Sequence, residues 1–145
     1  FYRFDAKVTQ FGAEKIKTIG DAYMVVSGAP DPRVDHAHVI ANLALALLEE
    51  INIIRQETGI ALNVRIGVHT GSVIAGVIGA MRFSYDIWGD TVNTASRMES
   101  HGEAGRIHIS QQSKERICGK FKVELRGTID VKGKGNMQTW WLLAD

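Results

Sequence analysis

The sequence predicts an α+β fold in which antiparallel strand pairs pack against helices. Along the chain, an expected helix, strand pair, helix, strand pair and helix follow one another. Strands and helices do not alternate one for one, as they would in a doubly wound parallel sheet. The expected strands alternate polar and apolar residues, whereas the expected helices repeat apolar residues at helical spacing. These three observations favour an α+β sandwich formed by one domain over residues 1–145.

The first half of the chain supplies the clearest elements. Phe4, Val8 and Phe11 recur at helical spacing, and Gly20-Asp21 separates two alternating segments as the turn of a hairpin would. A long amphipathic segment follows a loop and is expected to end as a helix near Gly59. The expected elements here are a helix ending near residue 11, strands at 14–19 and 22–26, and a helix at 34–57.

The second half is predicted to begin with another hairpin, whose turn is Thr70-Gly71. Its strands would be 62–68 and 72–78, both rich in apolar residues. The remaining expected elements are a helix at 91–99, a strand at 107–109, a short helix at 111–117, and strands at 121–126 and 139–143.

Composition and charge exclude several classes of protein. The 145 residues are 45% hydrophobic and 23% charged, which is typical of a globular domain. The net charge is +1 with both signs interspersed, so no nucleic-acid-binding surface is indicated. No apolar run of about 18 residues predicts a membrane span. Cys118 is the single cysteine, which excludes an internal disulfide and favours a reducing, cytoplasmic location.

The first of three polar clusters is Lys17-Thr-Ile-Gly-Asp21, at the turn of the first expected hairpin. Asp21 could present a carboxylate oxygen to Mg²⁺, and Gly20 would let the backbone approach the ion closely. An Asp in a Gly-Asp turn is also a common turn former. Taken alone, this cluster leaves both interpretations open.

The second cluster runs from Phe83 to Glu99 and enters an expected helix. Asn93 and Arg97 are four residues apart and therefore share a helix face. An amide and a guanidinium near the start of a helix suit an anionic phosphate. The alternative is a solvated helix face on which Arg97 pairs with Asp90 or Glu99.

The third cluster, Val131-Lys-Gly-Lys-Gly135, is a cationic loop that could close over a polyphosphate or be an ordinary surface turn. Other chemistries are poorly supported. The five histidines lack metal-ligand spacing with one another or with cysteine. The chain contains neither a Gly-x-Ser-x-Gly nucleophile elbow nor a phosphate-binding loop motif.

Together the clusters resemble the class III adenylyl and guanylyl cyclase family. The matching segments are Glu14-Lys-Ile-Lys-Thr-Ile-Gly-Asp-Ala-Tyr-Met24, Asp86-Ile-Trp-Gly-Asp-Thr-Val-Asn-Thr-Ala-Ser-Arg-Met98 and Lys132-Gly-Lys-Gly135. The resemblance implies a ferredoxin-like sandwich and a head-to-tail dimer with two active sites at its interface. It also implies two Mg²⁺ or Mn²⁺ ions at each site. The site residues that it implies are the catalytic pair Asn93 and Arg97, the substrate-binding residues Lys17, Asp86 and Lys132, and the metal ligand Asp21.

Lys17 and Asp86 indicate ATP as the substrate. Adenine offers an acceptor at N1 and a donor at its 6-amino group, whereas guanine offers the reverse pattern. A Lys donor and an Asp acceptor complement adenine, and each buried mismatch against guanine would cost about 1–3 kcal/mol. Guanylyl cyclases of the family typically have Glu and Cys at these places. The implied reaction is the conversion of ATP to cyclic AMP and pyrophosphate.

The resemblance also bears on assembly and on the extent of the domain. One chain carries Asp21 as well as the residues for base and phosphate, so a symmetric homodimer is expected. The family's other metal aspartate lies in a strand upstream of the first hairpin, and nothing in residues 1–10 matches it. The helical pattern also begins at Phe1 without a capping residue before it. The first strand of the fold is therefore expected to be missing from this chain.

Two alternatives to an adenylate cyclase remain. One is a catalytically silent, cyclase-like domain that binds nucleotide or regulates a partner, and the other is a guanylate cyclase. The sequence leaves open whether the parent protein has an upstream sensor or regulatory domain, and whether it is anchored to a membrane.

Overall fold

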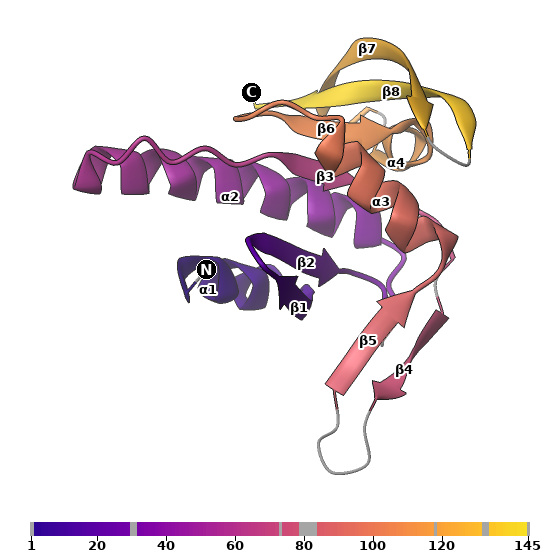
Figure 1. Cartoon of the computed structure of the whole chain (residues 1–145), viewed down its shortest axis with the longest axis horizontal. Helices are drawn as coiled ribbons and strands as arrows, with labels where there is room; N and C mark the ends of the chain where they lie inside the picture. The colour runs from indigo at the N-terminus through magenta and orange to yellow at the C-terminus, as the bar shows by residue number, and fades with distance from the viewer. Residues whose placement is uncertain are drawn as a thin grey trace.

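The computed structural model describes residues 2–29, 32–72, 74–78, 84–117, 119–131 and 134–144. In chain order, its elements are α1 (Tyr2–Gln10), β1 (Glu14–Ile19), β2 (Ala22–Val26), α2 (His36–Thr58), β3 (Ile66–Val68), β4 (Ile74–Ile78), β5 (Ser84–Trp88), α3 (Asp90–Ser100), β6 (Ile107–Ser110), α4 (Gln111–Ile117), β7 (Lys122–Val131) and β8 (Gly135–Leu143). Helix α2 runs through the middle of the molecule, between α1 with the β1–β2 hairpin and the layer that contains β6, β7 and β8 (Figure 1).

The described strands form three sheets. Strands β1 and β2 pair antiparallel, as do β4 and β5, and the third sheet has the order β3-β6-β8-β7. Within that sheet β3 runs parallel to β6, whereas β8 is antiparallel to both of its neighbours. Antiparallel pairs combined with packed helices confirm the predicted α+β class.

The predicted hairpin of 62–68 with 72–78 is wrong in its pairing. Strand β3 instead pairs in parallel with β6, with Ile66 opposite Ile107. Strand β4 pairs with β5, which the sequence pattern did not predict as a strand. Ile66 packs against the core cluster that contains Ile107, so burial against α2 and β6 selects the partner of this short strand. The turn residues Thr70-Gly71 do not decide it.

Helix α2 is the central element of the core. It ends where the sequence predicts, because Gly59 adopts a left-handed conformation with φ of 71° and donates its N–H to the carbonyl of Arg55 at 2.9 Å. Two clusters of buried residues share this helix. One cluster contains Ala37, Ala41, Ala44, Ile107, Ile109, Ile117 and Leu142. The other contains Phe4, Val8, Leu43, Leu47 and Ile51.

The length and composition of α2 alone would allow it to cross a membrane. Its contacts indicate a different role, because it packs between α1 and α4 and supplies both core clusters. A helix that is apolar on more than one side is expected when layers cover it on two sides.

Helix α3 approaches β3 unusually closely at Gly67. A Cβ atom added there would lie 2.1 Å from the backbone nitrogen of Glu99 and 2.6 Å from its Cα. Only a residue without a side chain therefore lets α3 lie directly on the strand. The neighbouring Arg65 Nη2 lies 3.1 Å from Glu99 Oε2, close enough for an ion pair although it is not aligned as a hydrogen bond.

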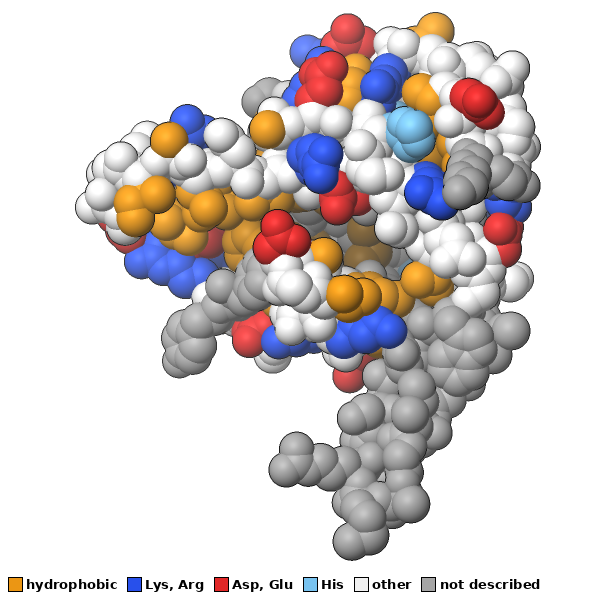
Figure 2. Space-filling model, in the orientation of Figure 1, with side chains coloured by type: hydrophobic (Ala, Val, Ile, Leu, Met, Phe, Trp, Pro, Cys, Tyr) orange, Lys and Arg blue, Asp and Glu red, His pale blue; other side chains and the backbone are white. Residues whose placement is uncertain are grey.

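The face between the β1–β2 hairpin and α3 is hollowed, and hydrophobic side chains lie in the hollow (Figure 2). Val25 of β2 and Ile66 of β3 both pack against the cluster that includes Phe4 and Leu47. The two sheets thus share one apolar layer on α2. Among the described residues, no strand pairing joins β2 to β3.

Candidate active site

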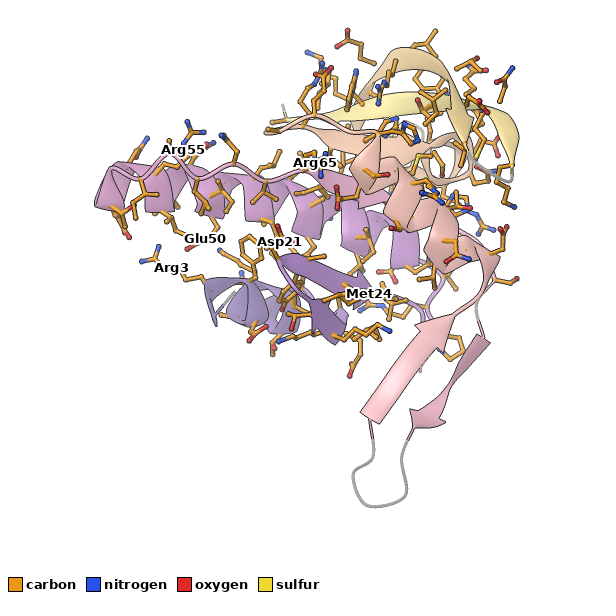
Figure 3. All side chains as sticks on the ribbon, viewed as in Figure 1. Arg3, Asp21, Met24, Glu50, Arg55 and Arg65 are labelled. Atoms are coloured by element: carbon orange, nitrogen blue, oxygen red, sulfur yellow. The ribbon has the colours of Figure 1, made fainter. Side chains whose placement is uncertain are left out.

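The β1–β2 hairpin holds Lys17 and Asp21. Gly20 has φ of 60°, a left-handed conformation that Gly adopts without strain, and it closes the turn before Asp21. The Asp21 side chain is exposed at the tip of the hairpin, whereas Met24 lies further along β2 (Figure 3). Lys17 is paired in register with Met24, next to an irregularity between Lys15 and Lys17. The hairpin therefore holds Lys17 on β1 and Asp21 in the turn that follows this strand.

Asp86 lies on β5, where its backbone is paired with Gly76 of β4. Strand β5 contacts β1, the strand that carries Lys17. The fold thus brings together the two strands that carry the predicted adenine-recognising residues, although Lys17 and Asp86 are 69 positions apart in the sequence. The position of the Asp86 side chain lies outside the described part of the structure.

Helix α3 follows β5 after a single residue, Gly89, whose φ of 118° is accessible to glycine. Asn93 and Arg97 are both exposed and one helical turn apart. Thr94 and Met98 on the same helix are buried, with 2% and 0% of their surface exposed. The buried stripe fixes the rotation of α3, so the amide and the guanidinium both face away from the core.

The carboxylates that the alternative interpretation assigned to Arg97 have other partners. Asp90 forms an ion pair with Lys134, and Glu99 lies beside Arg65. Arg97 is exposed on the helix surface, as a phosphate-binding residue would need to be. The described contacts therefore weaken the interpretation of Arg97 as a partner of Asp90 or Glu99.

The predicted polyphosphate-binding residue Lys132 lies outside the described residues. The rest of its loop is anchored on both sides of it. Val131 is buried with 1% of its surface exposed, and Lys134 pairs with Asp90 in the first turn of α3. The cationic loop thus returns to the start of the helix that carries Asn93 and Arg97. The sequence pattern did not predict that Lys134 and Asp90 pair, because they are far apart in the chain.

His69 also lies close to this ion pair. Its Nδ1 is 2.7 Å from Ser110 Oγ, and burial lowers the pKa of its ring, with Lys134 lowering it further and Asp90 opposing this. Thr91 anchors the same turn of α3 by donating from Oγ1 to the carbonyl of Ser72. The contact of Thr91 holds the N-terminal end of α3, and no local sequence motif would have identified it or the neighbouring hydrogen bond between His69 and Ser110.

The residues present fit a divalent metal only in part. Asp21 supplies an exposed carboxylate, which is a ligand suited to Mg²⁺ or Mn²⁺. In the described part of the chain, no group of three or more His, Cys, Asp or Glu side chains could hold a metal ion. Asp21 can therefore be one ligand of such an ion but does not form a complete site with described neighbours.

Comparison with known proteins places the chain in a family. The profile described as "Adenylate and Guanylate cyclase catalytic domain" matches residues 1–144. Human atrial natriuretic peptide receptor 2 is 51% identical over 98% of this chain and 14% of its own length. An adenylate cyclase of Mycobacterium tuberculosis is 48% identical over 97% of this chain and 32% of its own length. The chain thus spans no more than about a third of the length of these two relatives.

Solved structures agree with the fold. The guanylate cyclase domain of RhGC from Catenaria anguillulae, in complex with GTP, superposes with a TM-score of 0.92 at 46% identity, over 99% of this chain and 79% of that one. The catalytic core of a rhodopsin-guanylyl cyclase with converted specificity, in complex with ATPalphaS, superposes with a TM-score of 0.92 at 47% identity. The match covers 99% of this chain and 78% of that one. A non-canonical dimeric guanylyl cyclase domain from Blastocladiella emersonii superposes with a TM-score of 0.90 at 42% identity, over 99% of this chain and 78% of that one. The chain belongs to the class III adenylate and guanylate cyclase catalytic domain family.

Proposed function

We propose that this domain is an adenylate cyclase, which converts ATP to 3′,5′-cyclic AMP and pyrophosphate. The observation that carries the substrate assignment is the contact between β1 and β5, the strands that bear Lys17 and Asp86. An ammonium donor and a carboxylate acceptor on neighbouring strands match the N1 acceptor and 6-amino donor of adenine. Guanine would leave polar groups mismatched on both sides, at a cost of about 1–3 kcal/mol for each buried group.

The comparisons are compatible with either purine. Relatives of similar identity include a receptor and an adenylate cyclase, and one guanylyl cyclase core of converted specificity is described with an ATP analogue. That structure supports the view that this fold can accept ATP when the residues at the base permit it. In this chain those residues would be Lys17 and Asp86.

The reaction would be an intramolecular phosphoryl transfer. The ribose 3′ oxygen forms a bond to the α-phosphorus, the bond from that phosphorus to the oxygen bridging to the β-phosphate breaks, and pyrophosphate leaves while the 3′ hydroxyl loses its proton. Divalent metal ions, when bound, lower the pKa of the 3′ hydroxyl and neutralise the leaving group. Asp21 would be one of the residues that hold them.

Asn93 and Arg97 would act on the charge that develops at the α-phosphate. Both face outward from α3, and α3 is held on β3 by the close contact at Gly67. A donor fixed in advance in this way stabilises the transition state without having to reorganise during the reaction. Lys132 would bind the polyphosphate from the loop that returns to α3 at Lys134 and Asp90.

A head-to-tail homodimer would complete each site with residues from two copies. One chain carries Asp21 as well as Lys17, Asp86, Asn93, Arg97 and Lys132, so two copies could form two equivalent sites. Because relatives are much longer proteins, we place this domain in a longer polypeptide that can include a sensor or regulatory domain. The catalytic domain itself would lie in the cytoplasm, in keeping with its single cysteine and the cellular location of ATP.

The direct test is to identify the product. The purified full-length protein is incubated with ATP and Mn²⁺, and separately with GTP and Mn²⁺, and the cyclic nucleotide is identified by mass spectrometry. We expect cyclic AMP from ATP, with a kcat/KM at least about tenfold above that for GTP. A tenfold difference corresponds to about one mismatched polar group against guanine. Preferential formation of cyclic GMP would assign the domain to the guanylate cyclases. Nucleotide binding without either product would identify a silent cyclase-like domain.

A further inference from the structure

His108 is a fully buried titratable residue that the proposed reaction does not use. It lies on β6 with 0% of its surface exposed, and both of its ring nitrogens have partners. Nδ1 is 2.8 Å from the carbonyl oxygen of Met98, in the last turn of α3, and Nε2 is 3.3 Å from Arg126 Nη1 on β7. One side chain therefore links three elements.

The chemistry of these partners defines the protonation state of the ring. The carbonyl of Met98 can only accept, so Nδ1 must carry a hydrogen and donate it. The guanidinium of Arg126 can only donate, so Nε2 must be an unprotonated acceptor. His108 is therefore the neutral Nδ1–H tautomer in this arrangement.

Arg126 continues the contact to the end of α3. Its Nη1 also donates to the carbonyl of His101, the residue that follows the helix. The last carbonyls of a helix have no partner within the helix and carry partial negative charge. His108 satisfies one of these carbonyls, that of Met98, and Arg126 satisfies the carbonyl of the C-cap residue His101.

Trp141 holds this pair of side chains in place. It is paired in register with His108 across β6 and β8, and their ring centroids are 5.0 Å apart. The guanidinium carbons of Arg106 and Arg126 lie 4.1 Å and 4.9 Å from the centroid of the Trp141 ring, within cation–π range. Trp141 is 5% exposed, so this support is itself part of the core.

We propose that His108 is a positioning residue, which together with Arg126 fixes the C-terminal turn of α3 and thereby the placement of Arg97. This inference rests on the proposed role of Arg97 at the α-phosphate. Arg97 directly precedes Met98, whose carbonyl His108 holds. A displacement of about 1 Å in a group that orients a reacting phosphate can lower the rate by about a hundredfold.

Protonation of His108 would disrupt this arrangement. An imidazolium cannot accept from Arg126, and it would place a second positive charge beside the guanidinium. In the described part of the chain, the charged and titratable groups that act on the ring are Arg126 from β7 and His101 and Glu103 after α3, while Arg106 lies over the neighbouring Trp141 ring. Burial is the largest cause of a lowered pKa at His108, and Arg126 and His101 act in the same direction, while the Met98 carbonyl and Glu103 oppose them.

The experiment compares His108→Asn and Arg126→Gln with the wild type in the full-length protein. Asn keeps an N–H near the position of Nδ1 but loses the acceptor for Arg126. Gln keeps a donor for the carbonyl of His101 but removes the charge. His38→Asn on α2, which lies beside Phe121, serves as a matched control for replacing a histidine. Each variant is assayed for kcat and KM with ATP from about pH 5 to 8, a range that brackets the unperturbed pKa of histidine.

For His108→Asn, kcat is expected to fall by about tenfold to a hundredfold with little change in KM, while thermal melts show a folded protein at the assay temperature. For Arg126→Gln, loss of the neighbouring charge should move the acid limb of the kcat profile to higher pH. A purely structural role would lower activity in proportion to the unfolded fraction and leave this limb in place. An unchanged kcat in His108→Asn, or an acid limb that Arg126→Gln does not move, overturns the inference.

Nuclear magnetic resonance of the histidine rings separates this inference from the proposed function. In the wild type, the ¹⁵N shifts of His108 should show the Nδ1–H tautomer, and its titration should move to higher pH in Arg126→Gln. A wild type that makes no cyclic nucleotide overturns the proposed function. An Nε2–H tautomer at His108 overturns the positioning contact whether or not the protein is active.

Discussion

The phenolic hydroxyl of Tyr23 donates a hydrogen bond to the carboxylate of Asp5 and so ties strand β2 to helix α1. Lys15 on β1 lies 3.3 Å from the same carboxylate, and the rings of Phe4 and Tyr23 meet edge to face at 5.7 Å. The hairpin that carries Lys17 and Asp21 is thereby fixed to the helix that precedes it.

We expect Tyr23→Phe to lower the melting temperature, with a larger effect at pH 7 than at pH 3. The hydrogen bond from Tyr23, and then the contact with Lys15, lower the pKa of Asp5. The stabilisation is therefore present above the unfolded-state pKa of about 3.9 and is lost as the pH falls through the lower folded-state value. Melting curves at several pH values check this.

Asp5→Asn provides the matched control for Tyr23→Phe. The amide retains an oxygen that can accept from Tyr23 but has no charge to titrate. Its melting temperature should therefore depend less on pH between 3 and 7 than that of the wild type. This range includes the ordinary pKa of an aspartic acid side chain, which is about 3.9. A Tyr23→Phe effect of equal size at both pH values would contradict the assigned contact.

The double substitution Lys17→Glu with Asp86→Cys should shift preference from ATP towards GTP. It would reverse the donor and acceptor pattern that Lys17 on β1 and Asp86 on β5 are proposed to offer to the base. The ratio of kcat/KM for ATP to kcat/KM for GTP is expected to change by about tenfold to a hundredfold. One or two mismatched buried polar groups, at about 1–3 kcal/mol each, account for such a change. Each single substitution should lower activity with ATP without creating an efficient guanylate cyclase. An unchanged ratio in the double variant would remove these residues from base recognition.

Arg97→Ala should lower kcat by about a hundredfold or more while leaving KM for ATP nearly unchanged. A donor that acts mainly on charge developing in the transition state contributes to kcat more than to binding. Arg116→Ala, an exposed arginine on α4, is a suitable control for the loss of a surface cation. A rise in KM with kcat preserved would instead assign Arg97 to ground-state binding.

Mixing Asp21→Ala with Asn93→Ala protein should restore part of the activity that each lacks alone. In a head-to-tail dimer with shared sites, a mixed pair can combine the two defects in one site and leave the other site intact. Activity in an equimolar mixture, measured after exchange of subunits, should approach about a quarter of the wild-type value if the subunits pair at random and each site requires both residues. No recovery despite demonstrated exchange would contradict a site built from two chains.

Gly67→Ala should destabilise the domain by about 1–3 kcal/mol, the usual cost of overpacking a well-packed core. The added Cβ would lie 2.1 Å from the backbone of Glu99, and a helix backbone cannot move aside as a flexible side chain can. Denaturant unfolding monitored by circular dichroism would measure the loss. Because α3 carries Asn93 and Arg97, the folded fraction of this variant should also have a lower kcat. A stability equal to that of the wild type would contradict the close packing of α3 on β3.

The sequence predicted local elements well because their signals are local. Apolar residues at helical spacing predicted α2, and Gly59 predicted its end. Gly20 predicted the turn of the β1–β2 hairpin, which the structure confirms. The family motifs also predicted the fold class and the family that the comparisons confirm.

The tertiary structure decided which distant elements meet. A hairpin signal at Thr70-Gly71 favoured pairing of neighbouring strands, yet β3 pairs with β6, because its half-buried Ile66 and Val68 pack against the core cluster that contains Ile107. The pairing of Lys134 with Asp90 and the contact of His108 with Met98 likewise join residues that no local pattern relates.

By itself, the sequence determined the chemical groups available to this protein and the local turns and helices that display them. A carboxylate at a Gly-Asp turn and an amide and a guanidinium on one helix face are properties of residue type and spacing, whereas the proposed role of Lys17 and Asp86 in recognising adenine comes from the family resemblance. Only the tertiary structure decided that β1 contacts β5 and that α3 is held at both ends. The physical reason is that such contacts depend on burial and close packing between distant segments, whereas periodicity and turn preference act over a few neighbouring residues.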